Sequence, residues 1–196
     1  MHPAERAIQP MNDHVPARIL VAGVGNIFWG DDAFGVEVVN RLGQRPLPPD
    51  VRVVDFGIRA MDLTYALLEP YEAVILVDAM PRGQAPGTLY VLEPTLENEL
   101  PADVSIEVHD MNPVKVLRLA QSLGSRVSQL VVVGCEPQPS LEDDEMRMGL
   151  SPAVTAVVDE AACLVESLAA RLLNGTFAAS HPADLSKALP PGEVGS

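Results

Sequence analysis

Apolar residues along this chain form short unbroken runs, and between the runs they recur every three or four positions. A short unbroken run bounded by turn residues is typical of a buried strand, and the longer period is typical of a helix. The runs predict strands over residues 18–24, 51–55, 73–77, 88–92 and 129–133. The longer period predicts helices over residues 33–42 and 60–68, and from residues 113 and 152 onward. Strands that alternate with helices indicate an α/β sandwich with a mostly parallel sheet.

Local signals mark where the folded part begins and ends. Asn112-Pro113 and Ser151-Pro152 each combine an N-cap residue with a proline in the first helical position, and Gly175 follows the last helix. We expect a flexible leader, a single α/β domain and a disordered tail rich in Pro, Ala, Gly and Ser. Their respective bounds are residues 1–17, 18–175 and 176–196.

Composition narrows the classes of partner and the compartment. The 196 residues are 47% hydrophobic and only 4% aromatic, which predicts an aliphatic core. Thirteen basic residues against 27 acidic ones give a net charge of −14, which disfavours binding to nucleic acids and to anionic membranes. The sequence contains neither a signal peptide nor a run of about 18 apolar residues, so we expect a cytoplasmic protein. Cys135 and Cys163 stand in apolar contexts, as buried reduced thiols do.

Chemistry-bearing residues gather where the predicted strands end. Parallel sheets place their sites beyond the carboxyl ends of the strands, and the loop 23–32, Asp78, the His109 loop and the turn at Gly134 all fall there. Asp78 follows a buried strand and therefore needs a backbone donor, a base or a metal as partner. The pair Asp31-Asp32 can equally cap the following helix. Two carboxylates and one imidazole would suit Zn²⁺ or Ni²⁺.

Two other kinds of site are conceivable from the same residues. A dinucleotide site requires a third glycine where Phe28 stands, and Asp31-Asp32 would repel the diphosphate, although Asp55 could hold a ribose hydroxyl. A cysteine nucleophile would be Cys135 with His109 as base, but no nucleophile elbow surrounds Cys135. Both alternatives are weaker than a cation site.

Seven segments in fixed order carry a resemblance to a known family. They are G-V-G-N-I-F-W-G-D-D-A-F-G-V, D-F-G-I-R-A-M-D-L, V-I-L-V-D-A-M, P-G-T-L-Y-V-L, H-D-M-N-P-V-K-V-L, V-V-V-G-C-E-P and L-S-P-A-V-T-A-V-V-D-E. Together they span about residues 18–173, and the series resembles the [NiFe]-hydrogenase maturation endopeptidases. The resemblance implies a three-layer α/β sandwich around a twisted sheet, with helices on both faces.

The resemblance also implies a reaction. Members of that family remove a C-terminal extension from the hydrogenase large-subunit precursor after nickel insertion. On this chain the metal-contacting and catalytic positions match Asp32, Asp78 and His109. The nickel is expected to come with the substrate, and Ni²⁺ or a surrogate such as Zn²⁺ or Cd²⁺ can occupy the site. Trp29 is bulkier than the aliphatic residue expected there, and we expect it to pack.

Two questions about this reaction stay open at the level of sequence. The attacking water could be polarised by the metal or by a carboxylate, and Asp55 or Glu136 could help to orient the peptide. A non-catalytic nickel-binding maturation chaperone could use the same three ligands to hold the metal. The leading hypothesis is a metal-dependent endopeptidase.

Overall fold

A five-stranded sheet forms the centre of the protein, in a computed structural model that describes residues 17–94, 113–139 and 147–177. The strand order is β2-β1-β3-β5-β4, with every neighbouring pair parallel except β4 and β5. The strands are β1 (Ile19–Val24), β2 (Val51–Gly57), β3 (Ala73–Ala79), β4 (Leu89–Leu92) and β5 (Gln129–Cys135). The prediction of a mostly parallel sheet is confirmed, and β2, β3 and β5 run two residues further than predicted.

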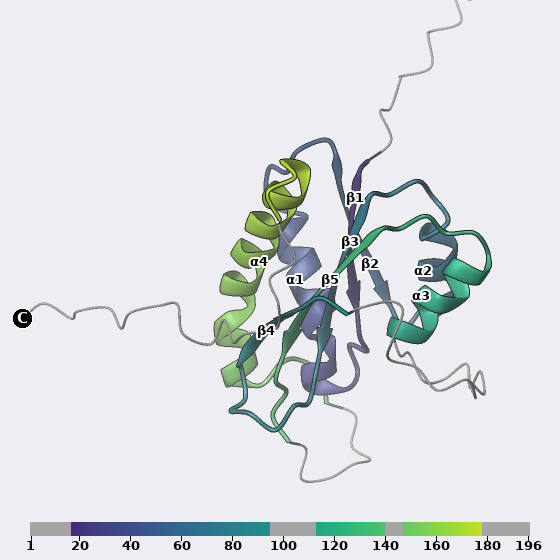
Figure 1. Cartoon of the computed structure of the whole chain (residues 1–196). Coiled ribbons are helices and arrows are strands. Elements are labelled where there is room, and N and C mark those ends of the chain that lie inside the picture. Colours follow the sequence, from purple (N-terminus) through teal and green to yellow (C-terminus); the bar gives the residue numbers. More distant parts are fainter. Residues whose placement is uncertain (1–16, 95–112, 140–146, 178–196) are drawn as a thin grey trace, which may run out of the picture.

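Two layers of helices enclose the sheet, as Figure 1 shows. On one face α1 (Phe34–Leu42) packs beside α4 (Pro152–Leu173), and on the other α2 (Ala60–Ala66) packs beside α3 (Pro113–Ser122). A short 3-10 turn, η1 (Gly30–Ala33), joins the loop after β1 to α1. The expected three-layer α/β sandwich is therefore confirmed.

The unbroken apolar runs are explained by burial on both faces of the sheet. Successive side chains of a strand point to opposite faces. In β1, Ile19 belongs to the core under α1 and α4, whereas Leu20 belongs to the core under α2 and α3. Phe34 and Val38, one helical turn apart on α1, fill the first of these cores and are fully buried.

Helix boundaries follow the capping signals where the structure describes them. The Ser151 hydroxyl accepts a hydrogen bond from Val154 N (3.4 Å), and Pro152 opens α4. Beyond the other end, Gly175 adopts a φ of 64°, a left-handed conformation that suits glycine. Helix α2 ends at Ala66, two residues before its predicted end. The predicted cap Asn112, the leader up to residue 16 and the tail from residue 178 lie outside the described residues.

Two expectations about single side chains are wrong. Cys163 is exposed rather than part of the core, because α4 buries its other face, and its Sγ lies 3.4 Å from Arg45 Nη1 of the segment after α1. Trp29 is 50% exposed, because the loop after β1 turns it outward instead of packing it. Within the described ranges, no helix combines the length and apolar character needed to cross a bilayer.

Candidate functional site

The carboxyl ends of three neighbouring strands bring separate parts of the sequence to one edge of the sheet. Gly23 of β1 pairs with Asp55 of β2 on one side and with Val77 of β3 on the other. The next residue of β3, Asp78, pairs with Gly134 of β5. Asp55, Asp78 and the loop after β1 therefore share this edge, as the sequence predicted. We call it the β1–β3 edge. His109, the third predicted ligand, lies outside the described residues.

Two glycines let the loop after β1 fold back tightly onto this edge. Gly25 has a φ of 128°, and a Cβ there would lie 1.8 Å from the Asp32 carbonyl oxygen. At Gly35 in α1, a Cβ would lie 2.1 Å from Val77 O of β3. Any side chain at either position would separate η1 and α1 from the strand ends. Close packing of bare backbone thus places Asp32 at the edge.

The Asp32 carboxyl group faces its own loop. Its Oδ2 accepts a hydrogen bond from the Asn26 backbone N–H at 2.6 Å. Although the residue as a whole is exposed, partial loss of water around the carboxyl raises the pKa of Asp32, and the Asn26 hydrogen bond opposes that rise. The Asp32 carboxyl therefore combines incomplete hydration with one hydrogen bond from its own loop.

Asp78 is the most perturbed acid of the edge. The pKa of this half-buried side chain is raised to about 8, first by burial and then by the negative charge of Asp32, while a hydrogen bond from the Ala79 N–H opposes the rise. Turn η1, which carries Asp32, packs against β3, which carries Asp78 near its end. Two neighbouring carboxyl groups in a poorly hydrated place do not readily ionise together unless a bound cation balances their negative charges.

Asp55 adds an unsatisfied acceptor to the same edge. Its Oδ1 is buried, and no group among the described residues donates a hydrogen bond to it. A buried acceptor left without a donor costs about 1–3 kcal/mol. Asp55 Oδ1 is therefore an acceptor at this edge that is unpaired within the described part of the chain.

Glu136 is the other residue considered for orienting a peptide, and its carboxylate already accepts hydrogen bonds from within the fold. The backbone N–H groups of Arg82 and Gly83 donate to its carboxylate at 2.8–3.0 Å, and the Tyr90 hydroxyl donates as well. These donors, Tyr90 first, lower the pKa of Glu136 despite its burial. Glu136 holds the chain between β3 and β4 against β5, which removes it as a candidate for contacting the peptide.

The structure also argues against the cysteine nucleophile. Cys135 is fully buried, and burial, together with the charges of Asp31 and Glu136, raises the pKa of its thiol to about 12. The nucleophile of a cysteine enzyme is the thiolate, which such a pKa suppresses at neutral pH.

A phosphate cradle is disfavoured for a different reason. The backbone N–H of Asn26 donates to Asp32, and that of Phe28 donates to the Asn26 side-chain oxygen at 3.1 Å. A dinucleotide site would need such N–H groups to face the diphosphate. Here the loop after β1 uses both for its own carboxylate and amide.

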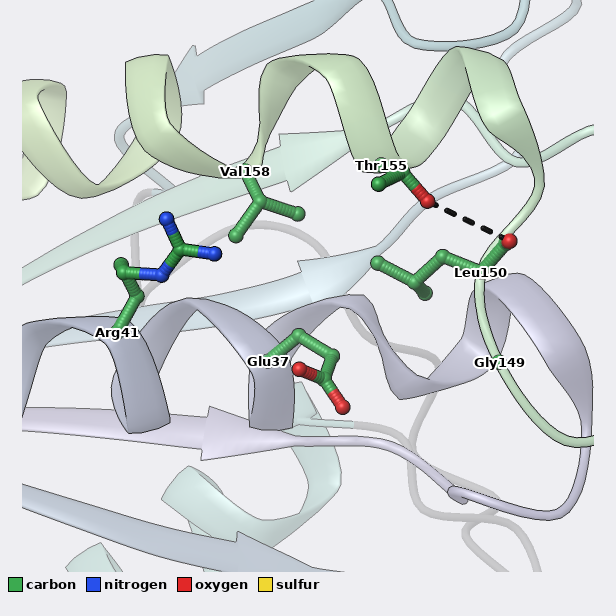
Figure 2. Close-up of a pocket in the computed structure, with 6 residues that line it drawn as sticks. All are labelled: Glu37, Arg41, Gly149, Leu150, Thr155 and Val158. Atoms are coloured by element: carbon green, nitrogen blue, oxygen red, sulfur yellow. Dashed lines mark hydrogen bonds between the residues drawn. The ribbon is translucent and has the colours of Figure 1, made fainter.

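A separate hollow of about 250 Å³ opens between α1 and the first turns of α4 (Figure 2). Glu37 and Arg41 of α1 face Leu150, Thr155 and Val158 across it, and Thr155 Oγ1 donates to Leu150 O. Neither Asp32 nor Asp78 lines this hollow. The candidate site therefore depends on the strand ends and not on this depression.

The donor set of the β1–β3 edge fits a divalent cation. Within the described ranges no group of three His, Cys, Asp or Glu side chains is arranged to hold a metal, and the edge supplies two of the three predicted ligands, Asp32 and Asp78. Carboxylate oxygens combined with one imidazole suit borderline ions such as Ni²⁺ or Zn²⁺. A cation would relieve the repulsion between the two carboxylates.

Comparison with known proteins points to one family. The family model described as hydrogenase maturation protease, HycI, matches residues 36–168. Among curated proteins, the hydrogenase 2 maturation protease of Escherichia coli is 34% identical over 164 residues, which cover 82% of this chain and 94% of that protein. The hydrogenase expression/formation protein HupD of Rhodobacter capsulatus is 34% identical over 148 residues, which cover 74% of this chain and 67% of that protein.

Solved structures give the same result. The hydrogenase maturating endopeptidase HybD from Escherichia coli is 33% identical, with a TM-score of 0.63 over 81% of this chain and 94% of that one. The [NiFe] hydrogenase maturation protease HycI from Thermococcus kodakarensis is 25% identical, with a TM-score of 0.61 over 80% of this chain and 94% of that one. Both the sequence and the architecture of the chain match these proteins.

Proposed function

Because this chain belongs to the hydrogenase maturation protease family, we propose that it is the endopeptidase that removes the C-terminal extension of a [NiFe]-hydrogenase large-subunit precursor after nickel insertion. The observation that supports the proposal is the packing of η1, which carries Asp32, against β3, which carries Asp78, and the charge of Asp32 adds to the raised pKa of Asp78. In this proposal the nickel belongs to the substrate, and Asp32, Asp78 and His109 complete its coordination.

The electrostatics of the edge explain why cleavage would require nickel in the precursor. Without a cation, bringing a peptide to two crowded carboxylates gains little and leaves their repulsion in place. With nickel already held by the precursor, docking joins a divalent cation to both carboxylates. A precursor that lacks nickel therefore lacks the strongest bond to the protease, and it stays uncut.

The chemical step requires an activated water and a fixed peptide. Because Cys135 is fully buried with a raised pKa, the nucleophile in this proposal is a water polarised by the metal or by a carboxylate. The buried Oδ1 of Asp55 would accept an N–H group of the bound peptide and so orient the scissile bond. Docking of the precursor supplies the remaining rate enhancement by positioning.

Intact-mass spectrometry of the precursor tests the proposal directly. A nickel-loaded large-subunit precursor incubated with the protein should lose one C-terminal peptide, and the nickel-free precursor should not. The variants Asp32→Asn, Asp78→Asn and His109→Ala should each leave the nickel-loaded precursor uncut while remaining folded. Asp62→Asn is the matched control, because Asp62 is an exposed carboxylate on α2 that pairs with Arg59.

A non-catalytic nickel-binding chaperone is the second candidate, and the same experiment separates the two. That function would give Ni²⁺ binding that depends on Asp32, Asp78 and His109 but no loss of mass from any precursor. If the nickel-free precursor is cleaved at the same rate, the protein is still a protease, but nickel is not the element by which it recognises the precursor.

A further inference from the structure

The adjacent residues Asp31 and Asp32 have opposite surroundings. Asp31 is only 8% exposed, whereas Asp32 is exposed at the β1–β3 edge. Both belong to the four-residue turn η1. Nothing in the sequence D-D distinguishes them, so the difference arises from what surrounds the turn.

The Asp31 carboxylate accepts three hydrogen bonds from two distant segments. Oδ1 accepts from Ser151 N at 2.6 Å, and Oδ2 accepts from Gln138 N at 2.8 Å and from Ser151 Oγ at 2.9 Å. Gln138 follows β5, and Ser151 caps α4. Hydrogen bonds from N–H and O–H donors to a carboxylate are stronger than those between neutral groups. Asp31 thus ties η1 to the end of β5 and to the start of α4.

Backbone hydrogen bonds also join the loop after β1 to the segment before α4. Gly30 N donates to Arg147 O at 2.7 Å, and Arg147 N donates to Phe28 O at 3.0 Å. This short parallel bridge lies next to the Asp31 hydrogen bonds, four residues before Ser151. The loop 28–31 is therefore fastened along its length to the segment that leads into α4.

The position of Asp32 depends on that attachment. A 3-10 turn of four residues has few internal hydrogen bonds of its own, so its placement comes from its neighbours. The Asp32 carboxyl group has one described backbone donor, Asn26 N, and its charge acts on Asp78. Release of Asp31 would free η1 to shift, and the Asn26 bond and the approach to Asp78 would weaken together.

We propose that Asp31 is a positioning residue: its buried carboxylate fixes η1 against Gln138 and Ser151 and thereby holds the Asp32 carboxylate beside Asp78. Its importance for processing rests on the proposed function, whereas the geometric claim does not. Residues around a metal site that orient its ligands typically change metal affinity or activity by about 10–100-fold when removed.

The variant Asp31→Asn separates positioning from simple capping. The amide keeps the size of the side chain, but it has one acceptor oxygen where the carboxylate uses two. Val165→Ala is the control, because Val165 is a buried core residue of α4 with no link to η1. Amide hydrogen exchange by NMR on the full chain is the measurement.

Positioning predicts lost protection at Asn26 in Asp31→Asn, in addition to Gln138 and Ser151. The loss at Asn26 should match that in Asp32→Asn, and Val165→Ala should retain the protection. Retained protection at Asn26 in Asp31→Asn, with loss confined to Gln138 and Ser151, would overturn the proposal and leave Asp31 as a helix cap. This readout involves neither metal nor precursor, so it decides the matter even if the proposed function fails.

Processing and metal binding supply the second readout. If the wild type cleaves the nickel-loaded precursor, Asp31→Asn should lower kcat about 10–100-fold with a smaller change in KM, and it should weaken Cd²⁺ binding by a similar factor. Cleavage by Asp31→Asn at the wild-type rate would refute a positioning role in the reaction. Absence of cleavage by the wild type refutes the proposed function instead.

Discussion

The acids at the carboxyl ends of the strands differ in how many hydrogen-bond donors the fold supplies to them. At the end of β5, Glu136 receives two backbone N–H groups and the Tyr90 hydroxyl, and its pKa is lowered. At the β1–β3 edge, the pKa of Asp78 is raised to about 8, and Asp55 Oδ1 has no donor among the described residues. The fold therefore supplies several donors to Glu136 and fewer to Asp55 and Asp78.

The contrast gives a physical criterion for sorting carboxylates. A buried acid that collects several donors stabilises the fold, whereas a buried acid that lacks them destabilises it and is retained where a ligand supplies the missing charge or proton. Asp31, with three hydrogen bonds, belongs to the first group, and Asp55 and Asp78 belong to the second. The following substitutions test whether the distinction holds.

The largest effect is expected from Asp78→Asn. Processing of the nickel-loaded precursor should fall about 10³-fold, because a neutral amide cannot replace the carboxylate that meets the cation. The free energy of unfolding at pH 7 should not decrease. A folded-state pKa raised from 3.8 means that this group's effect on stability worsens as pH rises toward 8, and the amide removes that effect.

Two measurements check this pair of expectations. Intact-mass kinetics follow processing, and urea unfolding at pH 7 follows stability, with Asp62→Asn as the control for both. A variant that loses activity and also unfolds in less urea than the wild type would place Asp78 with the structural acids.

The opposite pattern is expected from Glu136→Gln. The free energy of unfolding should fall by about 2–3 kcal/mol, because the amide leaves one of the converging donors without an acceptor. Tyr90→Phe, which removes one donor to the same carboxylate, should give a smaller loss of about 1–2 kcal/mol. Urea unfolding measures both variants.

Activity completes the test of Glu136. Folded Glu136→Gln should process the precursor within about twofold of the wild-type rate, since donors of the fold already occupy its carboxylate. A loss of processing in fully folded protein would show that the end of β5 belongs to the site after all.

A moderate effect is expected from Asp55→Asn. We expect kcat/KM for the precursor to fall about 10-fold, because the amide oxygen retains one acceptor but the charge that aligns the peptide N–H is lost. Stability should stay within about 0.5 kcal/mol of the wild type, since Oδ1 makes no described hydrogen bond that could be lost. Initial rates at several precursor concentrations provide kcat and KM, and an unchanged kcat/KM would remove Asp55 from the peptide site.

The smallest effect on processing is expected from Cys135→Ala. The rate should stay within about twofold of the wild type, because burial keeps the thiol protonated. The free energy of unfolding should fall by about 1–2 kcal/mol through loss of buried sulfur and incomplete closure of the cavity. Cys163→Ala, at an exposed position, should change it by less than about 0.5 kcal/mol. An inactive but folded Cys135→Ala would restore the thiol as nucleophile.

Several parts of the fold and site are predictable because they depend on local pattern. The apolar runs of β1, β3 and β5 predict strands buried on both faces, and Ser151-Pro152 predicts the first turn of α4. The rule that parallel strands place their sites at their carboxyl ends is enough to bring Asp32 and Asp78 together from the sequence. The placement of His109 stays a prediction, because it lies outside the described residues.

The errors have a common cause. The apolar neighbours of Cys163 and Trp29 predict packed positions, yet both residues are exposed. Neighbours in sequence show that a segment is apolar, but not which side of it meets the core. On α4 that choice is made by α1 and the sheet, and in the loop after β1 it is made by the pairing with Arg147.

Hydrophobic period is a local property, so the amino-acid sequence alone predicts the α/β architecture and the edge of the sheet at which Asp32 and Asp78 lie. Which of those acids receive hydrogen-bond donors is decided only when the chain folds. Asp31 and Asp32 are chemically identical neighbours. Asp31 accepts hydrogen bonds from residues 107 and 120 positions away, whereas Asp32 accepts a hydrogen bond from a residue six positions away. The state of a buried carboxylate depends on the donors and charges around it, and most of those come from distant parts of the chain.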